Sequence, residues 1–576
     1  MKLGMIYILL MCLLSVNAQA ANKAEAQYKK YKESWTLHED HSQEHRVYQE
    51  LTLYTHTAMN STYGETFIQY NPKHQKLKIH ASYTRQKDGT MVKTPENAFV
   101  PVLPKDAQNM PAYNHLQEMV IVHTGLELSA TIVLDYSIIS EPGYWEELDI
   151  CQKLLKSSPI QEGEFKFTIP ENSIPYYTLL GMKAEPQISN TAEGKTYTWS
   201  FKNLPALSRA PETNLQNEDV PGIVFNTYKS AQDAMAHVFK YFDNPQNLKE
   251  VAEKIADNQK TDFEKMSAIQ EYVISHIDYS PLSIQACGNS IRNAAEVLKT
   301  ACATDIEKIN LLYGLLNASG IKAIPAAACY VNISPEHCAL NAIKEWLVLA
   351  YVDDTEYRLN VRNHAPTALS SNFLIRLDNG DKIESTNQTR FIRFKASIDW
   401  KNSQPQAQIA ASFSRNMLNY SLQAVNEIIS LRDKSEDMSK ENIATLKGAS
   451  DVNTHKEQDY IFMSLPEVAA DKILGNYNGY NSKRTGNLLL PQLWDEEYSY
   501  DISLPDNVKL CTPTIEKKIE NQVGKIIISL QKDGNSIHVL RTLKINKRLI
   551  VPEEYENFKR LVNEWLDPHF KTLLLQ

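Results

Sequence analysis

The sequence predicts a multi-domain α+β protein with an N-terminal antiparallel β-sandwich, a central α+β core and a C-terminal β-rich domain. Apolar and polar residues alternate in several runs between positions 48 and 201, as expected of half-buried strands. Apolar residues then recur at helical spacing between 247 and 316, and strand patterns return after 390. The 576 residues are enough for three or four domains of roughly 150 residues each.

The first twenty residues have the pattern of a secretory signal. Lys2 is followed by an apolar run over 3–16 and then by Ala18-Gln19-Ala20, a small-residue cleavage pattern. The run is too short for a typical membrane span, and nothing after Ala20 resembles a transmembrane helix. We therefore expect a signal peptide over 1–20, cleavage near Ala20, and a soluble protein that is periplasmic or secreted.

Charge and cysteine content exclude several classes of function. The chain has 60 Lys and Arg against 69 Asp and Glu, and no cluster of basic residues, so no nucleic-acid partner is expected. Six cysteines follow the leader, too few for a disulfide scaffold, although Cys329 and Cys338 are close enough in sequence to pair across a loop. No pattern indicates a cofactor, and none fixes the oligomeric state.

The predicted N-terminal sandwich occupies 21–205. Its strand-like runs are separated by turns that contain Pro or Gly, and they lie at 48–56, 77–83, 118–122, 130–139, 164–169 and 196–201. Residues 205–232 hold three prolines and show little periodicity, so 206–242 is predicted to be a linker on the surface.

The central core, predicted at 243–390, begins with helices and ends with strands. Helical spacing predicts helices at 247–256, 262–277 and 293–298. Thr304 and Glu307 form a capping-box pattern that starts a fourth helix, and Gly320 ends it. A buried strand follows at 321–331, and a hairpin is predicted from the runs at 345–352 and 356–361.

The C-terminal region, predicted at 391–576, is mainly β. Strand patterns occur at 391–400, 407–413, 498–504, 524–530 and 537–541. Residues 417–431 have the composition of a helix, and the charged segment 435–459 is predicted to be an exposed connection. An amphipathic helix is predicted near the end, at 552–566.

Two sets of motifs carry a resemblance to a known family. The helix opening Ala301-Cys302-Ala303-Thr304-Asp305 and the strands after it resemble the core of exported bacterial transglutaminase-like, papain-related proteins over about 245–365. The motifs at 70–73, 87–90 and 121–130 resemble, in their order, the β-rich domain of unknown function that precedes such cores. The resemblance implies a thiolate at the helix N-terminus, an imidazole on the first hairpin strand and an orienting Asp on the second.

The family's catalytic residues are replaced in this chain. Asp305 matches the position of the cysteine, and Glu307 matches the acidic residue two positions later. Glu345 stands where the family has its histidine, and Asn360 where it has the orienting Asp. A carboxylate cannot act as the thiolate, so the resemblance predicts a core that has lost thiol catalysis.

Three other sites are compatible with the same residues. Cys302, three residues before Asp305, is an alternative nucleophile with His337 or His364 as its base. Cys329, Cys338, Cys302 and both histidines are metal-ligand types, but without a recognised ligand spacing. Asp305 with Glu345 has the residue types of a paired-carboxylate glycosidase, whereas a structural interpretation is that Asp305 favours a helix N-terminus.

We expect an exported accessory protein of the cell envelope that binds peptide or glycan in the ancestral cleft. The 29 Tyr and 7 Trp are compatible with such a surface, and equally with ordinary sheet packing. The alternative is a cysteine-dependent peptidase or acyltransferase that uses Cys302.

Overall fold

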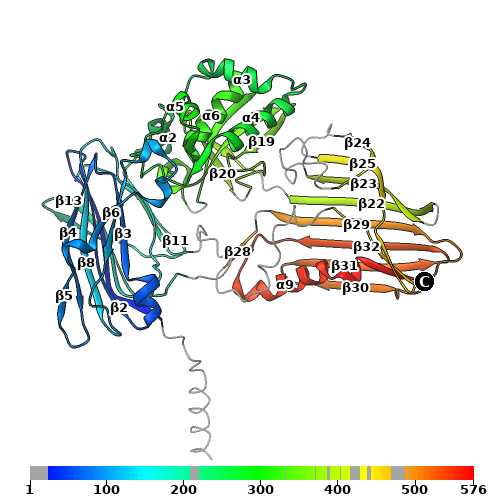
Figure 1. The fold of residues 1–576 in the computed structure, drawn as a ribbon, viewed down its shortest axis with the longest axis horizontal. Coiled ribbons are helices and arrows are strands. Elements are labelled where there is room, and N and C mark those ends of the chain that lie inside the picture. Colours follow the sequence, from blue (N-terminus) through cyan, green and yellow to red (C-terminus); the bar gives the residue numbers. More distant parts are fainter. Residues whose placement is uncertain are drawn as a thin grey trace, which may run out of the picture.

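The computed structural model describes residues 24–207, 220–330, 333–369, 371–385, 389–401, 404–414, 429–437, 443–468, 487–490 and 492–576. The predicted signal peptide and most of the predicted helix at 417–431 lie outside the described residues. The chain forms a β-rich N-terminal domain, a central core and a C-terminal β domain, so the predicted fold class is confirmed (Figure 1). Among the described residues, no helix combines the length and the apolar character needed to cross a bilayer.

An eight-stranded sheet forms one layer of the N-terminal domain. Its strands, in spatial order, are β12 (Gln187–Thr191), β13 (Gly194–Leu204), β10 (Ile160–Ile169), β1 (Ala26–Leu37), β2 (Gln43–Leu53), β8 (Thr131–Ser140), β4 (Gln75–Arg85) and β5 (Met91–Lys93). All neighbours are antiparallel except β1 and β10, which pair in parallel. The sheet is thus antiparallel, as predicted, except at this one pair, because β1 and β10 are far apart in sequence and their contacts are encoded by no local pattern.

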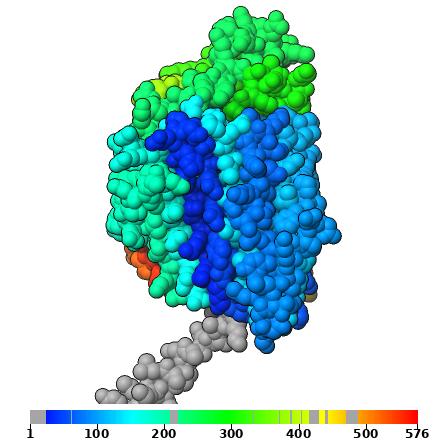
Figure 2. Space-filling view, turned by 90° about the vertical axis from the view of Figure 1, so that its left-hand side faces the viewer, coloured from blue at the N-terminus to red at the C-terminus, as the bar shows by residue number. Residues whose placement is uncertain are grey.

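Two three-stranded sheets form the second layer of the sandwich. One contains β3 (Glu65–Tyr70), β7 (Gln117–Val122) and β6 (Phe99–Val102), and the other contains β11 (Tyr176–Leu180), β14 (Gly222–Asn226) and β9 (Asp149–Lys153). Tyr136 of β8 packs against the apolar cluster beneath each of them, so both cover the same face of the large sheet. Figure 2 shows this domain from outside, with the central core over one end.

Strand β14 belongs to two hydrophobic cores at once. All five of its residues are buried. Ile223 and Phe225 pack into the N-terminal core, while Val224 between them packs into the core of the central domain. Helix α2 (Ala231–Phe239) follows it and packs into the same central core. The prediction of a surface linker at 206–242 is therefore corrected for the described residues 220–242, because a strand buried on both faces has no alternation to reveal it.

Helices and a five-stranded sheet build the central core. The helices are α3 (Lys249–Ala256), α4 (Asp262–His276), α5 (Ala294–Thr300) and α6 (Asp305–Ala318), which confirms the predicted helices to within a few residues. The sheet order is β19 (Thr355–Leu359), β18 (Ile343–Val352), β17 (Lys322–Cys329), β20 (Phe373–Arg376) and β21 (Lys382–Glu384). Helix α6 packs on this sheet, and β18 and β19 form the predicted hairpin.

A second eight-stranded sheet dominates the C-terminal domain. Its order is β24 (Arg432–Asp437), β25 (Ile443–Asp451), β23 (Gln404–Ser414), β22 (Thr389–Lys401), β29 (Leu493–Ser503), β32 (Ser536–Ile545), β31 (Gly524–Asp533) and β30 (Ile515–Glu520). Helix α9 (Pro552–Leu566) packs its apolar side on the domain core, as its pattern predicted.

The segment predicted to be an exposed connection, 435–459, instead carries the second half of β24, all of β25 and β26 (Thr454–Glu457). Only Ala444 and Leu446 of β25 contribute fully buried apolar side chains, so the charged residues around them hid the strand pattern.

The contact between the N-terminal domain and the core contains a buried carboxylate. Asp149 Oδ2 accepts a hydrogen bond of 3.0 Å from the Asn341 amide, and Asn341 Nδ2 donates to the Asp149 carbonyl at 2.6 Å. Asp149 Oδ1 is buried and has no hydrogen-bond partner in the described part of the chain. Burial raises the pKa of Asp149 to about 7, against the opposing effect of the amides of Asn341 and Leu340.

Replacing Asp149 with Asn should change how stability depends on pH. The pKa of Asp149 in the fold is raised, so between about pH 4 and pH 7 the folded protein keeps a proton that the unfolded chain has released, and stability falls as pH rises. Between pH 5 and pH 8, the free energy of unfolding of the natural protein should fall by about 1–3 kcal/mol more than that of Asp149→Asn. Urea unfolding of both proteins at the two pH values measures this difference, and parallel pH profiles would contradict it.

Candidate functional site

The start of α6 is fixed by its own sequence and by a short strand before it. Thr304 is the N-cap, and its amide donates to Glu307 Oε2 at 2.9 Å within a capping box. The residues before it form β16 (Cys302–Thr304), which pairs in parallel with β15 (Asp278–Ser280). At the other end, Gly320 takes a φ of 88°, which a side chain would disfavour. The predicted helix is confirmed at both ends.

Asp305, at the position of the family's cysteine, is held by an arginine. Arg362 Nε donates to Asp305 Oδ1 at 3.1 Å, and Arg362 Nη2 donates to Asp305 Oδ2. The Tyr279 hydroxyl lies 3.4 Å from Oδ2, and the guanidinium of Arg362 lies over the Tyr279 ring, 4.7 Å from its centre. The hydrogen bonds to Asp305 raise the pKa of Arg362. The carboxylate at the helix N-terminus is therefore paired with a guanidinium group.

Glu345 and Asn360 are engaged in loop contacts of their own. Glu345 Oε2 accepts hydrogen bonds from Thr367 Oγ1 at 2.6 Å and from the Ala368 amide at 2.8 Å. Asn360 Oδ1 accepts from the amides of Arg362 and Asn363, while its Nδ2 donates to the Ala365 carbonyl.

No hydrogen bond or ion pair joins the three matched positions to one another in the described chain. They are connected through Arg362 instead. This residue pairs with Asp305, Glu345 contributes electrostatically to its raised pKa, and its amide donates to Asn360.

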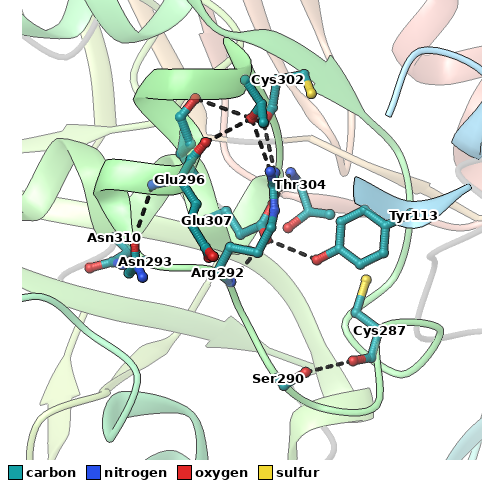
Figure 3. Close-up of polar contacts among 12 residues, drawn as sticks. Tyr113, Cys287, Ser290, Arg292, Asn293, Glu296, Cys302, Thr304, Glu307 and Asn310 are labelled. Atoms are coloured by element: carbon teal, nitrogen blue, oxygen red, sulfur yellow. Dashed lines mark hydrogen bonds and ion pairs between the residues drawn. The ribbon is translucent and has the colours of Figure 1, made fainter. Parts of the chain in front are cut away.

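Glu307 is the centre of a buried polar network (Figure 3). Arg292 donates two hydrogen bonds to its carboxylate, from Nε to Oε1 at 2.8 Å and from Nη2 to Oε2 at 2.9 Å. The amide of Arg292 and the hydroxyl of Tyr113, from the N-terminal domain, donate to Oε1 at 3.0 and 2.8 Å. Burial opposes ionisation, but Arg292 and the amides outweigh it and hold the pKa of Glu307 below its usual value.

The alternative nucleophile Cys302 lies next to this network. It is 4% exposed and packs in a small apolar cluster with Ala107, Met110, Tyr113, Leu116 and Leu282. Its carbonyl, rather than its sulfur, accepts a hydrogen bond from Arg292 Nη2 at 2.7 Å.

The two candidate bases are engaged elsewhere. The ring of His364 contacts α4, with Nδ1 3.1 Å from Gln270 Oε1 and Nε2 2.6 Å from Glu271 Oε2. His337 stacks on Tyr176 of the N-terminal domain, with ring centres 4.4 Å apart. In the described chain, neither imidazole forms a hydrogen bond with Cys302.

The remaining cysteines comprise one disulfide pair, two largely buried free thiols and one exposed thiol. Cys329 and Cys338 form a disulfide. Burial raises the pKa of the Cys287 thiol to about 12, even though the Tyr113 hydroxyl lowers it by hydrogen bonding, and burial raises the pKa of Cys151 to about 12 as well. Cys511 is exposed. The described residues contain no group of three or more His, Cys, Asp or Glu placed to hold a metal ion.

Four residues around the helix start were not singled out from the sequence. Arg362 follows Asn360 by two residues, and its charge opposite to Asp305 was the available signal. Tyr113 and Arg292 join Glu307 from distant segments, for which no signal exists in one sequence. Lys308 is 1% exposed and donates to the Ile277 carbonyl at 2.7 Å, at the end of α4, and burial lowers its pKa to about 8.

Replacing Glu307 with Gln should destabilise the protein strongly. The amide would leave Arg292 in the network without its counter-charge, a change that costs about 3–5 kcal/mol for buried pairs. Glu296→Gln is the matched control, because Glu296 is an exposed residue of α5, and it should change stability by less than about 0.5 kcal/mol. Chemical unfolding of the two variants compares them, and equal stabilities would contradict the role given to Glu307.

Three family models match the chain. Residues 39–208 match a domain of unknown function with a solved structure, DUF3857, and residues 249–333 match the transglutaminase-like superfamily. Residues 459–575 match a second domain of unknown function with a solved structure, DUF3858. None of the curated proteins matches.

A search of solved structures found the two crystal structures described next. One, described as a putative protease from Parabacteroides distasonis ATCC 8503, is 34% identical, with 96% of this chain and 99% of that chain covered and a TM-score of 0.72. The other, described as a putative cysteine protease from Cytophaga hutchinsonii, is 11% identical, with 38% and 75% covered and a TM-score of 0.19, too low to support any argument. The chain therefore belongs to the transglutaminase-like superfamily, within a multi-domain family in which β-rich domains flank the core.

Proposed function

We propose that this protein is an exported, non-catalytic accessory protein of the cell envelope that binds peptide or glycan. The observation that supports it most directly is Asp305, which stands where the family has its cysteine and is paired with Arg362. Acyl transfer by this family needs a thiolate at the helix N-terminus and an imidazole beside it. Here that position carries a carboxylate that is paired with a guanidinium group. Such a carboxylate does not replace the thiolate as the nucleophile for acyl transfer.

The contacts of Glu345 and Asn360 support the same proposal. Each matched position forms hydrogen bonds that shape the loop 360–368 rather than orienting a catalytic group. The glycosidase arrangement requires two carboxyl groups that face a bond and differ in protonation. Asp305 forms an ion pair with Arg362. The paired-carboxylate hypothesis therefore has less support than a structural role for Asp305.

A cysteine-dependent peptidase or acyltransferase is the second candidate. One observation favours it: the 34% identical structure from Parabacteroides distasonis is described as a putative protease and covers nearly the whole chain. In this chain the nucleophile would be Cys302. Its burial and the engagement of both histidines elsewhere argue against an activated thiol in the described conformation.

Thiol reactivity separates the two candidates. We expect Cys511 to react first with iodoacetamide at pH 7.5, because it is the exposed free cysteine of the described residues, whereas Cys151, Cys287 and Cys302 should be at least about tenfold slower until the protein unfolds. Mass spectrometry of a labelling time course on the mature protein measures the order. Cys511→Ser should remove the fast phase.

Activity provides the second arm of the same test. The mature protein should neither hydrolyse peptides nor transfer glutamine acyl groups to amines, and Cys302→Ala should behave as the natural protein does. Fast labelling of Cys302, together with an activity that Cys302→Ala abolishes, would overturn the non-catalytic proposal and establish the second candidate.

A further inference from the structure

A cavity of about 210 Å³ lies where the N-terminal domain meets the central core. His45 and Ile138, from the inner face of the large N-terminal sheet, line one part of it. Tyr70 and Gln117, which are paired across β3 and β7, line another, and the core contributes Ser283, Gln285 and Ala286. At about 30 Å³ for each water molecule, the volume corresponds to roughly seven waters. The cavity is thus large enough for a small organic group and is formed by two domains together.

The lining contains both polar and apolar side chains. No Asp, Glu, Lys or Arg is among the described residues that line the cavity, and His45, which does line it, is paired with Glu33. Five side-chain amides also line it, those of Gln69, Asn71, Gln75, Gln117 and Gln285. An amide both donates and accepts hydrogen bonds, so this lining suits a neutral ligand that does the same.

Several of these amides have unused hydrogen-bonding capacity. Within the described part of the chain, the side chains of Gln69 and Gln285 form no hydrogen bond. Gln117 accepts from the Tyr70 hydroxyl at 2.9 Å, which leaves its NH2 group for another partner. Gln75 is more fully engaged, because its side chain accepts from the Asn71 backbone amide at 2.8 Å and donates to Ser140 Oγ at 3.0 Å. The cavity thus combines fixed and available amides.

Trp145 adds an aromatic ring to the lining of the cavity. Its indole Nε1 is itself buried, so it is not exposed to the cavity.

The walls of the cavity are held in place from both domains. Glu33, 4% exposed, lies 2.9 Å from His45 Nε2, and although burial opposes its ionisation, Lys156 and His45 hold the pKa of Glu33 to about 2. On the core side, the Tyr144 hydroxyl donates to the Ala286 carbonyl at 3.3 Å. A Cβ at Gly288 would come within 2.6 Å of the Tyr144 ring, so the loop packs closely against that ring. Because these walls are already ordered, ligand binding would cost little free energy for ordering side chains.

We propose that this cavity between the two domains, bounded by Trp145, Tyr70, Gln117 and Gln285, binds one uncharged sugar unit of a glycan. Sugar hydroxyls donate and accept hydrogen bonds, as the amides do. The aromatic rings, with Pro104, Leu116 and Ile138, supply apolar surface for the C–H face of a pyranose. The site is separate from Asp305, so it goes beyond the function proposed for the helix N-terminus and does not depend on it.

Binding can be measured on the full mature protein with four uncharged saccharides, namely glucose, N-acetylglucosamine, maltotriose and chitotriose. Titration calorimetry and tryptophan fluorescence should detect at least one of them with a Kd of about 1 mM or tighter. Gln285→Ala should weaken that binding by roughly threefold to tenfold, the effect of one neutral hydrogen bond. This variant should fold normally, because the Gln285 side chain forms no hydrogen bond in the described part of the chain.

A matched variant and a second probe test the result. Gln531→Ala, in the C-terminal domain, should bind the saccharide as the natural protein does. The proposal is overturned if none of the four saccharides binds, if Gln285→Ala binds unchanged, or if only a blocked, uncharged glutamine-containing peptide binds. Weaker sugar binding in Gln285→Ala supports this site even where the proposal for the helix N-terminus fails.

Discussion

The buried carboxylate of Glu307 is the interaction on which the central architecture depends. A charge removed from water is tolerated only when several donors surround it. Glu307 meets that requirement with the start of α6, with Arg292 from the loop before α5, and with Tyr113 from another domain. One side chain thus fixes where the helix begins, how the preceding loop folds and where the N-terminal domain attaches.

This arrangement explains why the helix start can keep its geometry while its first residue changes. In the family, the acidic residue two positions after the nucleophile is part of the motif, and here it is retained as Glu307 while the nucleophile position is Asp305. The buried network below the helix end does not involve the side chain of Asp305, which instead faces Arg362 and Tyr279. The fold therefore constrains Glu307 much more tightly than Asp305.

The sequence was informative wherever the physics is local. The capping box at Thr304, the stop at Gly320 and the β18–β19 hairpin depend on residues within a few positions of each other, and all three were predictable. Strand β14 was missed because burial on both faces removes the alternation that identifies a strand.

The site was predictable only in part. The positions of Asp305, Glu345 and Asn360 followed from a resemblance, but their partners did not, because Arg362, Thr367 and Ala368 come together through the fold. Besides capping the helix, Glu307 joins the core to the N-terminal domain through Tyr113. The sequence did not indicate this contact, because Tyr113 is 194 residues away in the chain. The cavity between the domains had no sequence signal, because its walls come from segments as distant as His45 and Gln285.

Strand β14 has a consequence for the evolution of this architecture. Its alternate residues complete the cores of two different domains, so neither domain has a finished interior without it. Recombination that exchanged the N-terminal domain for an unrelated one would have to replace the strand and both surfaces that it fills. The first two domains are therefore expected to be inherited as a single unit, even though each has the outline of an independent module.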